Sequence, residues 1–191
     1  MTRQPLNDER PVVIVLAAGR GERFRAAGGQ TGKLEAMLAG RPVLAHVLDA
    51  VTRSGLPCHV VRPQHLAHKP GAGMGDSIAA GVCATAGAAG WLILPGDLPL
   101  IQADTLRQVA ETLMALPAGQ ETVQPQCQGQ RGHPVGFRRP CGPALRALQG
   151  DEGAKGVLRQ WPALQLGVDD EGAVWDVDTP DRLEQAARRL R

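Results

Sequence analysis

The chain contains few aromatic residues and no excess of charge of either sign. There is no tyrosine, and aromatic residues make up 3% of the sequence. Proteins that bind single-stranded nucleic acid need exposed aromatic rings on which bases stack. The net charge is +2, from 21 basic and 19 acidic residues, so there is no field of one sign to hold a polyanion. We therefore expect no nucleic-acid partner.

The sequence also lacks the segments that mark membrane and secreted proteins. No apolar run approaches the length of about 18 residues that a membrane-spanning helix needs. Residues 1–10 are polar and contain no apolar core of a signal peptide. The cysteines form no C-x-x-C pair and fit neither a zinc site nor a disulfide scaffold; they are Cys58, Cys83, Cys127 and Cys141. These absences predict a cytoplasmic protein with reduced thiols and no membrane partner.

The length and the turn-forming residues favour one domain with many loops. A chain of 191 residues and 20.2 kDa suits a single α/β domain over residues 1–191, with residues 1–10 as a flexible tail. Glycine (24) and proline (15) together make up about a fifth of the residues. We expect these residues in turns or in loops that surround a ligand.

Short apolar runs alternate with amphipathic segments along the chain. The predicted strand at 122–126 contains Pro125, which has no backbone N–H to donate, so we expect this strand to lie at an edge of a sheet. Residues 18–32 show no periodicity and are predicted to form a loop. We expect strands at 12–17, 58–61, 91–94, 122–126, 135–138, 164–168 and 174–177, and helices from Pro42 to a cap at Gly55, at 74–86, 104–116, 143–148 and 154–160, and from Thr179-Pro180 to the end.

This order of elements predicts a Rossmann-like α/β fold. Alternating strands and helices give a doubly wound, mostly parallel sheet with helices on both faces. Ligands of such sheets bind outside the carboxyl ends of the strands. The loop after residues 12–17, Asp97 after residues 91–94, and Asp178 after residues 174–177 all fall at that edge.

The segment Leu16-Ala17-Ala18-Gly19-Arg20-Gly21-Glu22-Arg23, with Lys33 after it, suits anion binding. Small residues let backbone amides approach an anion closely, and Arg23 and Lys33 add charge that neutralises phosphates. The alternative is a flexible surface turn with solvated arginines. The segment is neither a Walker loop, because no Gly-Lys-Ser/Thr follows, nor the dinucleotide fingerprint, because the third glycine is missing.

Two aspartates at strand ends are candidate metal ligands. Asp97 lies between two prolines in LPGDLPL, where a hard carboxylate suits Mg²⁺ held together with triphosphate oxygens. In WDVDTP, a strand would place Asp176 and Asp178 on one side, about 7 Å apart, and either could complete the site. The alternatives are a turn-forming role for Asp97 and helix capping for Asp178.

Five segments in this order resemble the MobA-like nucleotidyltransferase family, and more closely its molybdenum cofactor cytidylyltransferase (MocA-like) branch. They are LAAGRGER (16–23) with Lys33, GMGDSIAAG (73–81), PGDLPLI (95–101), GQRGHPVGF (129–137) with GDEGAK (150–155), and DVDTPDRL (176–183). They cover nearly the whole chain. The resemblance implies a nucleotide-diphospho-sugar transferase-like fold and transfer of a nucleoside monophosphate to a phosphate-bearing acceptor, with release of pyrophosphate.

The resemblance also implies roles for individual residues. Arg23, Lys33 and Asp97 are the expected catalytic residues, and Asp97 and Asp178 are expected to hold Mg²⁺, with Mn²⁺ as an alternative. The chain departs from the family in residues 26–32, an insertion that delays Lys33. The expected nucleotide-binding residues are Leu16, Ala17, Ala18, Gly19, Gly21, Arg23, Lys33, Gly73, Ser77 and Asp97.

The choice of substrates rests on the same resemblance. The loop reads Leu-Ala-Ala-Gly, as in the cytidylyl branch, which favours CTP over GTP. The implied reaction transfers CMP from CTP to molybdenum-molybdopterin, with Arg131, His133 and Lys155 on the acceptor side. Alternatives are a loop histidine bonded to backbone for His133 and a solvated residue for Lys155. Rival functions are transfer from GTP, another acceptor such as a sugar phosphate or phospholactate, and a non-catalytic cofactor-delivery protein. The family also implies transient contact with a client molybdoenzyme.

Overall fold

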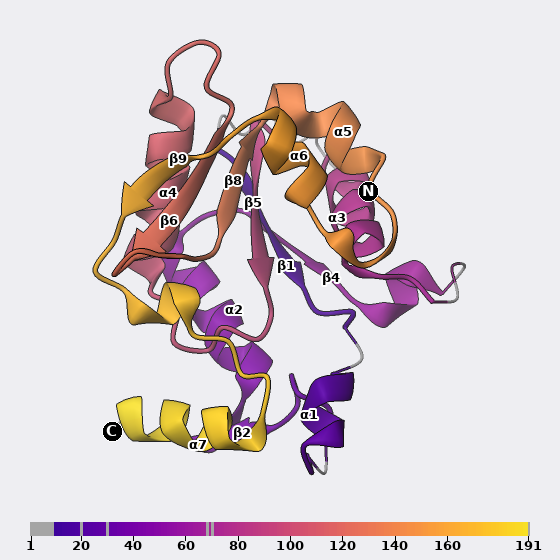
Figure 1. Ribbon diagram of the computed structural model, residues 1–191, viewed down its shortest axis with the longest axis vertical. Helices are drawn as coiled ribbons and strands as arrows, with labels where there is room; N and C mark the ends of the chain where they lie inside the picture. The colour runs from indigo at the N-terminus through magenta and orange to yellow at the C-terminus, as the bar shows by residue number, and fades with distance from the viewer. Residues whose placement is uncertain (1–9, 20, 30, 68, 70, 191) are drawn as a thin grey trace, which may run out of the picture.

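The computed structural model describes residues 10–19, 21–29, 31–67, 69 and 71–190 (Figure 1). The predicted N-terminal tail lies outside this part of the chain except for Arg10, which donates a hydrogen bond to the carbonyl of Gly55. Within the described residues, no helix is both long and apolar enough to cross a membrane.

A mixed sheet of seven strands crosses the molecule in the order β4-β1-β5-β8-β6-β7, and β9 pairs with the other side of β6. β1 pairs in parallel with β4 and β5, whereas β8 is antiparallel to both β5 and β6. Most strands therefore share one direction. The strands are β1 (Val12–Leu16), β4 (Cys58–Val61), β5 (Gly90–Pro95), β6 (Thr122–Cys127), β7 (Gln130–Arg131), β8 (Val135–Arg138) and β9 (Leu164–Gly167).

Helices cover both faces of this sheet because successive side chains of β1 point to opposite faces. Val13 and Val15 pack under α2 (Val43–Ser54) and α4 (Ala103–Ala115). Val12 and Ile14 pack under the helices of the other face. These helices are α3 (Met74–Ala84), α5 (Gly142–Arg146) and α6 (Lys155–Gln160). The predicted doubly wound, mostly parallel sheet is confirmed.

A separate layer lies beyond the carboxyl ends of β1 and β5, at the bottom of Figure 1. We call it the lower layer, and it consists of α1 (Glu22–Ala26), β2 (Met37–Leu38), β3 (Arg41–Pro42) and α7 (Pro180–Arg189). Phe24, Leu38, Val177 and Ala186 form its buried core. Neither α1 nor the β2–β3 hairpin is predicted from the sequence, because each is too short to show a hydrophobic period.

The remaining elements are short 3₁₀ helices in the connections. These 3₁₀ helices are η1 (Pro63–Leu66), η2 (Arg139–Cys141), η3 (Gly150–Glu152) and η4 (Glu171–Val174). The last of them, η4, follows β9 and leads back across the end of the sheet.

The predicted strand at residues 174–177 is wrong. The segment begins as the end of η4 and continues outside any strand to the start of α7. Asp170 accepts a hydrogen bond from the backbone N–H of Gly172 and so caps this turn. The alternating apolar and acidic residues have another cause, since Val177 packs into the lower layer and Trp175 lies under the guanidinium groups of α7.

The predicted edge position of Pro125 is also wrong, because β6 pairs with strands on both sides. Opposite β6, the returning chain is interrupted between β7 and β8, and the carbonyl of Pro125 accepts a hydrogen bond from Gly132 at this interruption. In an antiparallel pair, the backbone N–H and C=O groups of one residue point towards the same neighbouring strand. The missing N–H of Pro125 therefore falls where the ladder is already broken.

Asp170 is 2% exposed and joins η4 to the start of α4. Its carboxylate accepts hydrogen bonds from Gln102 N at 3.0 Å, Thr105 Oγ1 at 2.6 Å and Gly172 N at 2.8 Å. We expect Asp170→Ala to lower the free energy of unfolding by about 2–4 kcal/mol in urea titrations, because three donors lose their acceptor. The exposed neighbour Asp169 provides the control, since Asp169→Ala should change stability by less than about 0.5 kcal/mol. Equal effects of the two changes would contradict this role.

Candidate active site

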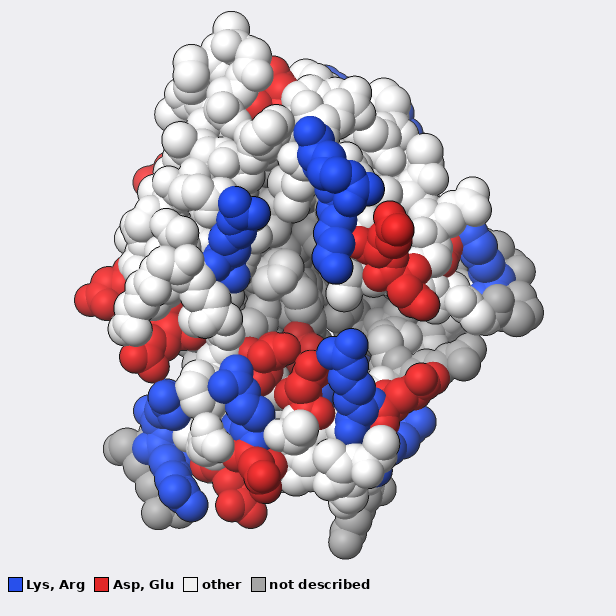
Figure 2. All heavy atoms as spheres, viewed as in Figure 1, with Lys and Arg blue, Asp and Glu red and all other residues white. Residues whose placement is uncertain are grey.

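A cleft of about 760 Å³ separates the carboxyl end of the sheet from the lower layer. Figure 2 shows this hollow across one face, with basic and acidic side chains along both its upper and its lower border. Residues from the β1–α1 loop, the end of β5 and the segment before α7 all line it. Segments distant in sequence therefore meet at the edge of the sheet where ligands of such folds bind.

Lys33 joins two of these segments. Its Nζ lies 2.5 Å from Oδ2 of Asp97 and 2.7 Å from Oδ1 of Asp178. Arg23 NH1 lies 3.3 Å from the other oxygen of Asp178, although the Arg23 side chain is 87% exposed. All four residues predicted to form the charged part of the site therefore come together. The insertion before Lys33 does not prevent its ammonium group from reaching both carboxylates.

Backbone hydrogen bonds fix the position of Asp97. Asp97 comes two residues after the end of β5, and the preceding Gly96 donates a hydrogen bond to the carbonyl of Leu16, the last residue of β1. The carbonyl of Asp97 accepts a hydrogen bond from Val177 N at 3.0 Å. Because Val177 is held in the core of the lower layer, its neighbour Asp178 is placed opposite Asp97.

The charged groups of this cluster stabilise one another. Burial lowers the pKa of Lys33, but the nearby charges of Asp97 and Asp178 and their hydrogen bonds outweigh it, and the pKa is raised overall. Burial alone would raise the pKa of Asp178, yet the hydrogen bonds and charges of Lys33 and Arg23 keep it below its ordinary value. At neutral pH the cluster therefore contains a protonated lysine and an ionised Asp178.

The β1–α1 loop forms one end of the cleft. Leu16, Ala18, Gly19 and Gly21 line it, whereas Ala17 is buried and does not. Gly21 has a φ of +62°, and a Cβ on it would lie 3.1 Å from the Cβ of Lys33. Both the positive φ and the short distance to Lys33 favour glycine at this position. Because glycine has no side chain, the loop can turn beside Lys33.

The segment at the start of α3 forms another wall. Gly73 and Ser77 line the cleft, and the Ser77 hydroxyl donates a hydrogen bond to the carbonyl of Gly73. A Cβ on Gly73 or Gly75 would come within 3 Å of the backbone of residues 149–150. The two loops can pack this closely only because these positions are glycine.

Asp76 joins the same two loops and is not predicted from the sequence. Its Oδ2 accepts hydrogen bonds from Gly73 N at 2.8 Å and Gly150 N at 2.9 Å, and Lys69 Nζ lies 2.5 Å from Oδ1. An acidic residue three positions after the N-cap residue, which here is Gly73, is a capping signal that could have identified the bond to Gly73. The bond to Gly150 spans 74 residues of sequence and leaves no such signal.

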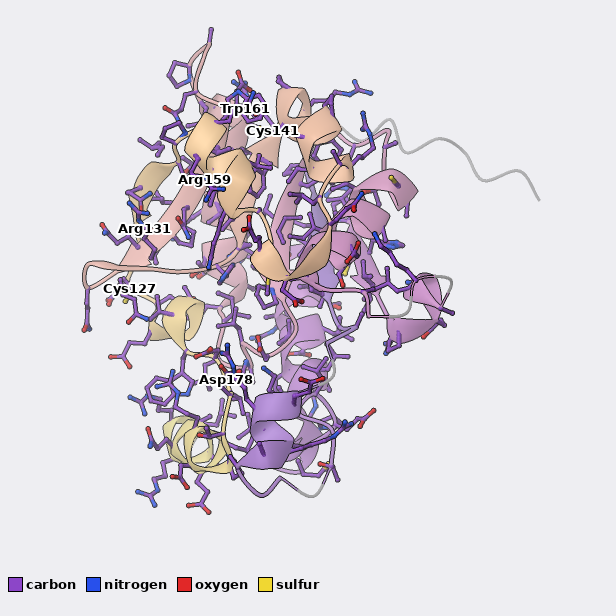
Figure 3. The ribbon with its side chains drawn as sticks, turned by 45° about the vertical axis from the view of Figure 1, so that its right-hand side comes forward. Cys127, Arg131, Cys141, Arg159, Trp161 and Asp178 are labelled. Carbon is purple, nitrogen blue, oxygen red and sulfur yellow. The ribbon has the colours of Figure 1, made fainter. Side chains whose placement is uncertain are left out.

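The predicted acceptor residues are only partly brought together. Arg131 and His133 line the cleft, but Lys155 begins α6 as an exposed residue that does not. Figure 3 shows Arg131 on the sheet side and Asp178 on the side of the lower layer. Burial lowers the pKa of His133, and the nearby charges of Asp97 and Asp176 offset this only in part. His133 is therefore neutral at neutral pH.

Met74 and Asp176 also line the cleft. Met74 belongs to the matched segment GMGDSIAAG, lies on the wall at the start of α3 and is 48% exposed. Asp176, one of the two candidate aspartates of WDVDTP, pairs with Arg182 instead of Lys33.

The spacing His65-x-x-His68 is typical of metal ligands on a helix, but Pro63 and Pro70 bracket the segment and a third ligand is missing from the motif. His68 lies outside the described residues.

Comparison with known proteins agrees with this arrangement. The pattern of the MobA-like NTP transferase domain matches residues 13–166. The chain belongs to this family. The match runs from β1 to β9 and contains the β1–α1 loop, Lys33, Asp97 and the proposed acceptor residues. Asp178 lies beyond it, in the segment that leads into α7.

Several known proteins resemble the chain along nearly its whole length. Purine catabolism protein PucB of Bacillus subtilis is 29% identical over 202 residues, which cover 93% of this chain and 96% of PucB. The crystal structure of Rv0371c from Mycobacterium tuberculosis has a TM-score of 0.72 at 23% identity, covering 94% of this chain and 98% of that one. A second structure of Rv0371c, with a TM-score of 0.69, is a complex with manganese.

The fold also matches molybdopterin-guanine dinucleotide biosynthesis protein A from Archaeoglobus fulgidus. The TM-score is 0.67 at 19% identity, with 94% of this chain and 98% of that chain covered. At this level of identity the likeness shows the shared fold. These structures therefore share the mixed sheet with helices on both faces.

The acid stability of the protein tests the role of Asp76. The Lys69 hydrogen bond and the N–H groups of Gly73 and Gly150 hold the pKa of Asp76 down to about 2. The stabilisation is complete above the unfolded-state pKa of about 4 and is lost as the pH falls towards 2. We expect the difference in unfolding free energy between wild type and Asp76→Asn to be constant above about pH 5 and to shrink below about pH 4. A difference that is independent of pH would contradict this.

Proposed function

We propose that this member of the family transfers CMP from CTP to molybdenum-molybdopterin in the cytoplasm, forming the cytosine dinucleotide cofactor and releasing pyrophosphate. The observation that carries the proposal is the meeting of Lys33, Asp97 and Asp178 at the end of a glycine-containing loop. This places cationic and metal-binding groups where a triphosphate has room to lie. The name of the Archaeoglobus fulgidus protein supports molybdopterin as the acceptor.

The carboxylates fit a divalent cation. Asp97 and Asp178 offer hard oxygen ligands, and the buried Oδ1 of Asp97 has no hydrogen-bond partner among the described residues. In the same part of the chain, no three His, Cys, Asp or Glu side chains are grouped to hold a metal. This suits Mg²⁺, which commonly takes one or two carboxylates and completes its shell with phosphate oxygens and water. The manganese complex of Rv0371c supports the same assignment, with Mn²⁺ as an alternative metal.

When bound, Mg²⁺ would supply positive charge to the triphosphate oxygens. The protein contributes further charge from Lys33 and Arg23 on the same side of the cleft. The acceptor phosphate is already anionic near neutral pH, so no general base is needed. Catalysis then consists of placing the acceptor oxygen in line with the α-phosphorus and offsetting the charge that accumulates there.

In this proposal the nucleotide and the acceptor lie on different sides of the cleft. Backbone amides of the β1–α1 loop bind phosphates, and the loop sequence Leu-Ala-Ala-Gly favours CTP over GTP. Gly73 and Ser77 shape the nucleotide side. On the acceptor side, the Arg131 guanidinium binds an anionic group, and neutral His133 donates or accepts a hydrogen bond. Lys155 contacts the acceptor phosphate only if it reaches over the rim of the cleft.

The direct test incubates the protein with labelled CTP, Mg²⁺ and molybdenum-molybdopterin. We expect pyrophosphate release that depends on all three components. Replacing CTP by GTP, or the acceptor by a sugar phosphate or phospholactate, should reduce the rate. Faster release with one of these substitutes would contradict the proposed substrates while keeping the reaction class, and transfer to none of the acceptors would contradict the reaction itself.

The carboxylates should be required for turnover. We expect Asp97→Asn and Asp178→Asn each to lower kcat by at least about 100-fold, because charge is lost where the reaction develops it. The exposed control Asp169→Asn should retain full activity. Circular dichroism checks that each variant is folded. Near-normal turnover of either cleft variant would remove that residue from the proposed site.

The acceptor side should be separable from the nucleotide side by steady-state kinetics. Arg131 is exposed at the rim of the cleft, so Arg131→Gln should leave the fold intact. We expect it to raise KM for the acceptor by about tenfold with little change in KM for CTP, because one charge-assisted contact to the acceptor is lost. Arg139→Gln, which changes an exposed arginine outside the cleft, is the matched control. An increase confined to KM for CTP would place Arg131 on the nucleotide side instead.

A further inference from the structure

The ammonium group of Lys33 occupies the point at which the two proposed metal ligands meet. One monovalent cation contacts an oxygen of each carboxylate, at 2.5 Å from Asp97 and 2.7 Å from Asp178. The side chains of Lys33 and Asp97 are each 17% exposed, and that of Asp178 is 30% exposed. Water screens such charges only in part. The free protein therefore already carries a cation of its own between these carboxylates.

This cation and a divalent metal would compete for the same oxygens. Two carboxylates this close repel each other unless a positive charge lies between them. A metal that binds alone must displace Lys33 and leave its buried ammonium without a comparable partner, which is costly. The flexible four-carbon stem of lysine allows the head group to move while the backbone stays in place.

A nucleotide changes this balance. The triphosphate brings new anionic oxygens into the cleft that Lys33 lines, and a displaced ammonium can pair with one of them. Arg23 cannot replace Lys33 between the carboxylates, since it reaches only the outer oxygen of Asp178 from an exposed position. Metal and nucleotide should therefore bind in a coupled manner, each raising the affinity for the other.

We propose that Lys33 is an exchangeable internal counter-ion that holds Asp97 and Asp178 together in the free protein and moves to a phosphate when metal and nucleotide enter together. This inference rests on the proposed function for the identity of the metal ligands. It adds that Lys33 suppresses binding of metal alone. The metal site thus forms only when a nucleotide is present to receive the lysine.

The test measures the binding of Mn²⁺ alone by electron paramagnetic resonance of the free ion. We expect Lys33→Met to bind Mn²⁺ at least about tenfold more tightly than wild type, because the competing ammonium is gone. Lys33→Gln should behave similarly and serves if the methionine variant does not fold. Arg139→Met removes an exposed cation from outside the cleft and should leave the Mn²⁺ affinity unchanged.

Two further measurements locate the effect. The double variant Lys33→Met/Asp97→Asn should lose the gained affinity, because one of the two carboxylates has become an amide. Addition of CTP should raise the Mn²⁺ affinity of wild type by a larger factor than that of Lys33→Met, since only wild type contains a lysine to transfer. Circular dichroism and thermal unfolding confirm that each variant is folded.

The outcomes separate this inference from the proposed function. If folded Lys33→Met and Lys33→Gln bind Mn²⁺ no more tightly than wild type, the counter-ion exchange is overturned, whatever the transfer assay shows. Conversely, a tenfold gain in Mn²⁺ affinity supports the exchange even if no acceptor is found. Failure of wild type to bind CTP in the presence of Mn²⁺ would contradict the proposed function.

Discussion

The ion pairs between Lys33 and the carboxylates of Asp97 and Asp178 hold the cleft in its observed form. They connect the loop after β1 with the end of β5 and with the segment before α7. In sequence, Lys33 is 64 residues from Asp97 and 145 residues from Asp178. Each pair is mostly buried, so breaking one would leave a charge without its partner in a poorly solvated place. The lower layer is thus joined to the end of β5 both by the backbone hydrogen bond from Val177 to Asp97 and by one lysine at the centre of the site.

The two sides of the cleft differ in construction, and this suits them to different tasks. The sheet side ends in backbone hydrogen bonds between Gly96 and Leu16 and between Asp97 and Val177, which leave Asp97 little freedom. The side of the lower layer carries cations on long side chains, of which Arg23 is 87% exposed. A fixed carboxylate beside movable positive charges fits a reaction in which polyphosphate enters, reacts and leaves. The match to the MobA-like NTP transferase family agrees with such a reaction.

The sequence predicted most of the sheet and helices because their signals are local. β1 is a continuous apolar run, and α7 begins with a threonine whose hydroxyl accepts a hydrogen bond from Arg182 N. The prediction of a strand at residues 174–177 was wrong because apolar and acidic residues also alternate in a segment without strand structure. Here Trp175 packs against the arginines of α7 and Val177 packs into the core of the lower layer. The role of Asp76 was not predicted for a different reason, since its hydrogen bond to Gly150 joins residues that are 74 positions apart in sequence. The charged residues of the site were identified by their type and position after predicted strands and by the family resemblance, whereas their mutual distances could come only from the structure.

The most direct test of the central claim is a crystal structure with CTP and Mn²⁺. The account predicts electron density for a cation between Asp97 and Asp178, with Lys33 Nζ moved away from them to within hydrogen-bond distance of a phosphate oxygen. The β1–α1 loop should surround the triphosphate. A structure in which the nucleotide is bound while Lys33 still bridges both carboxylates, with the cation elsewhere, would contradict it.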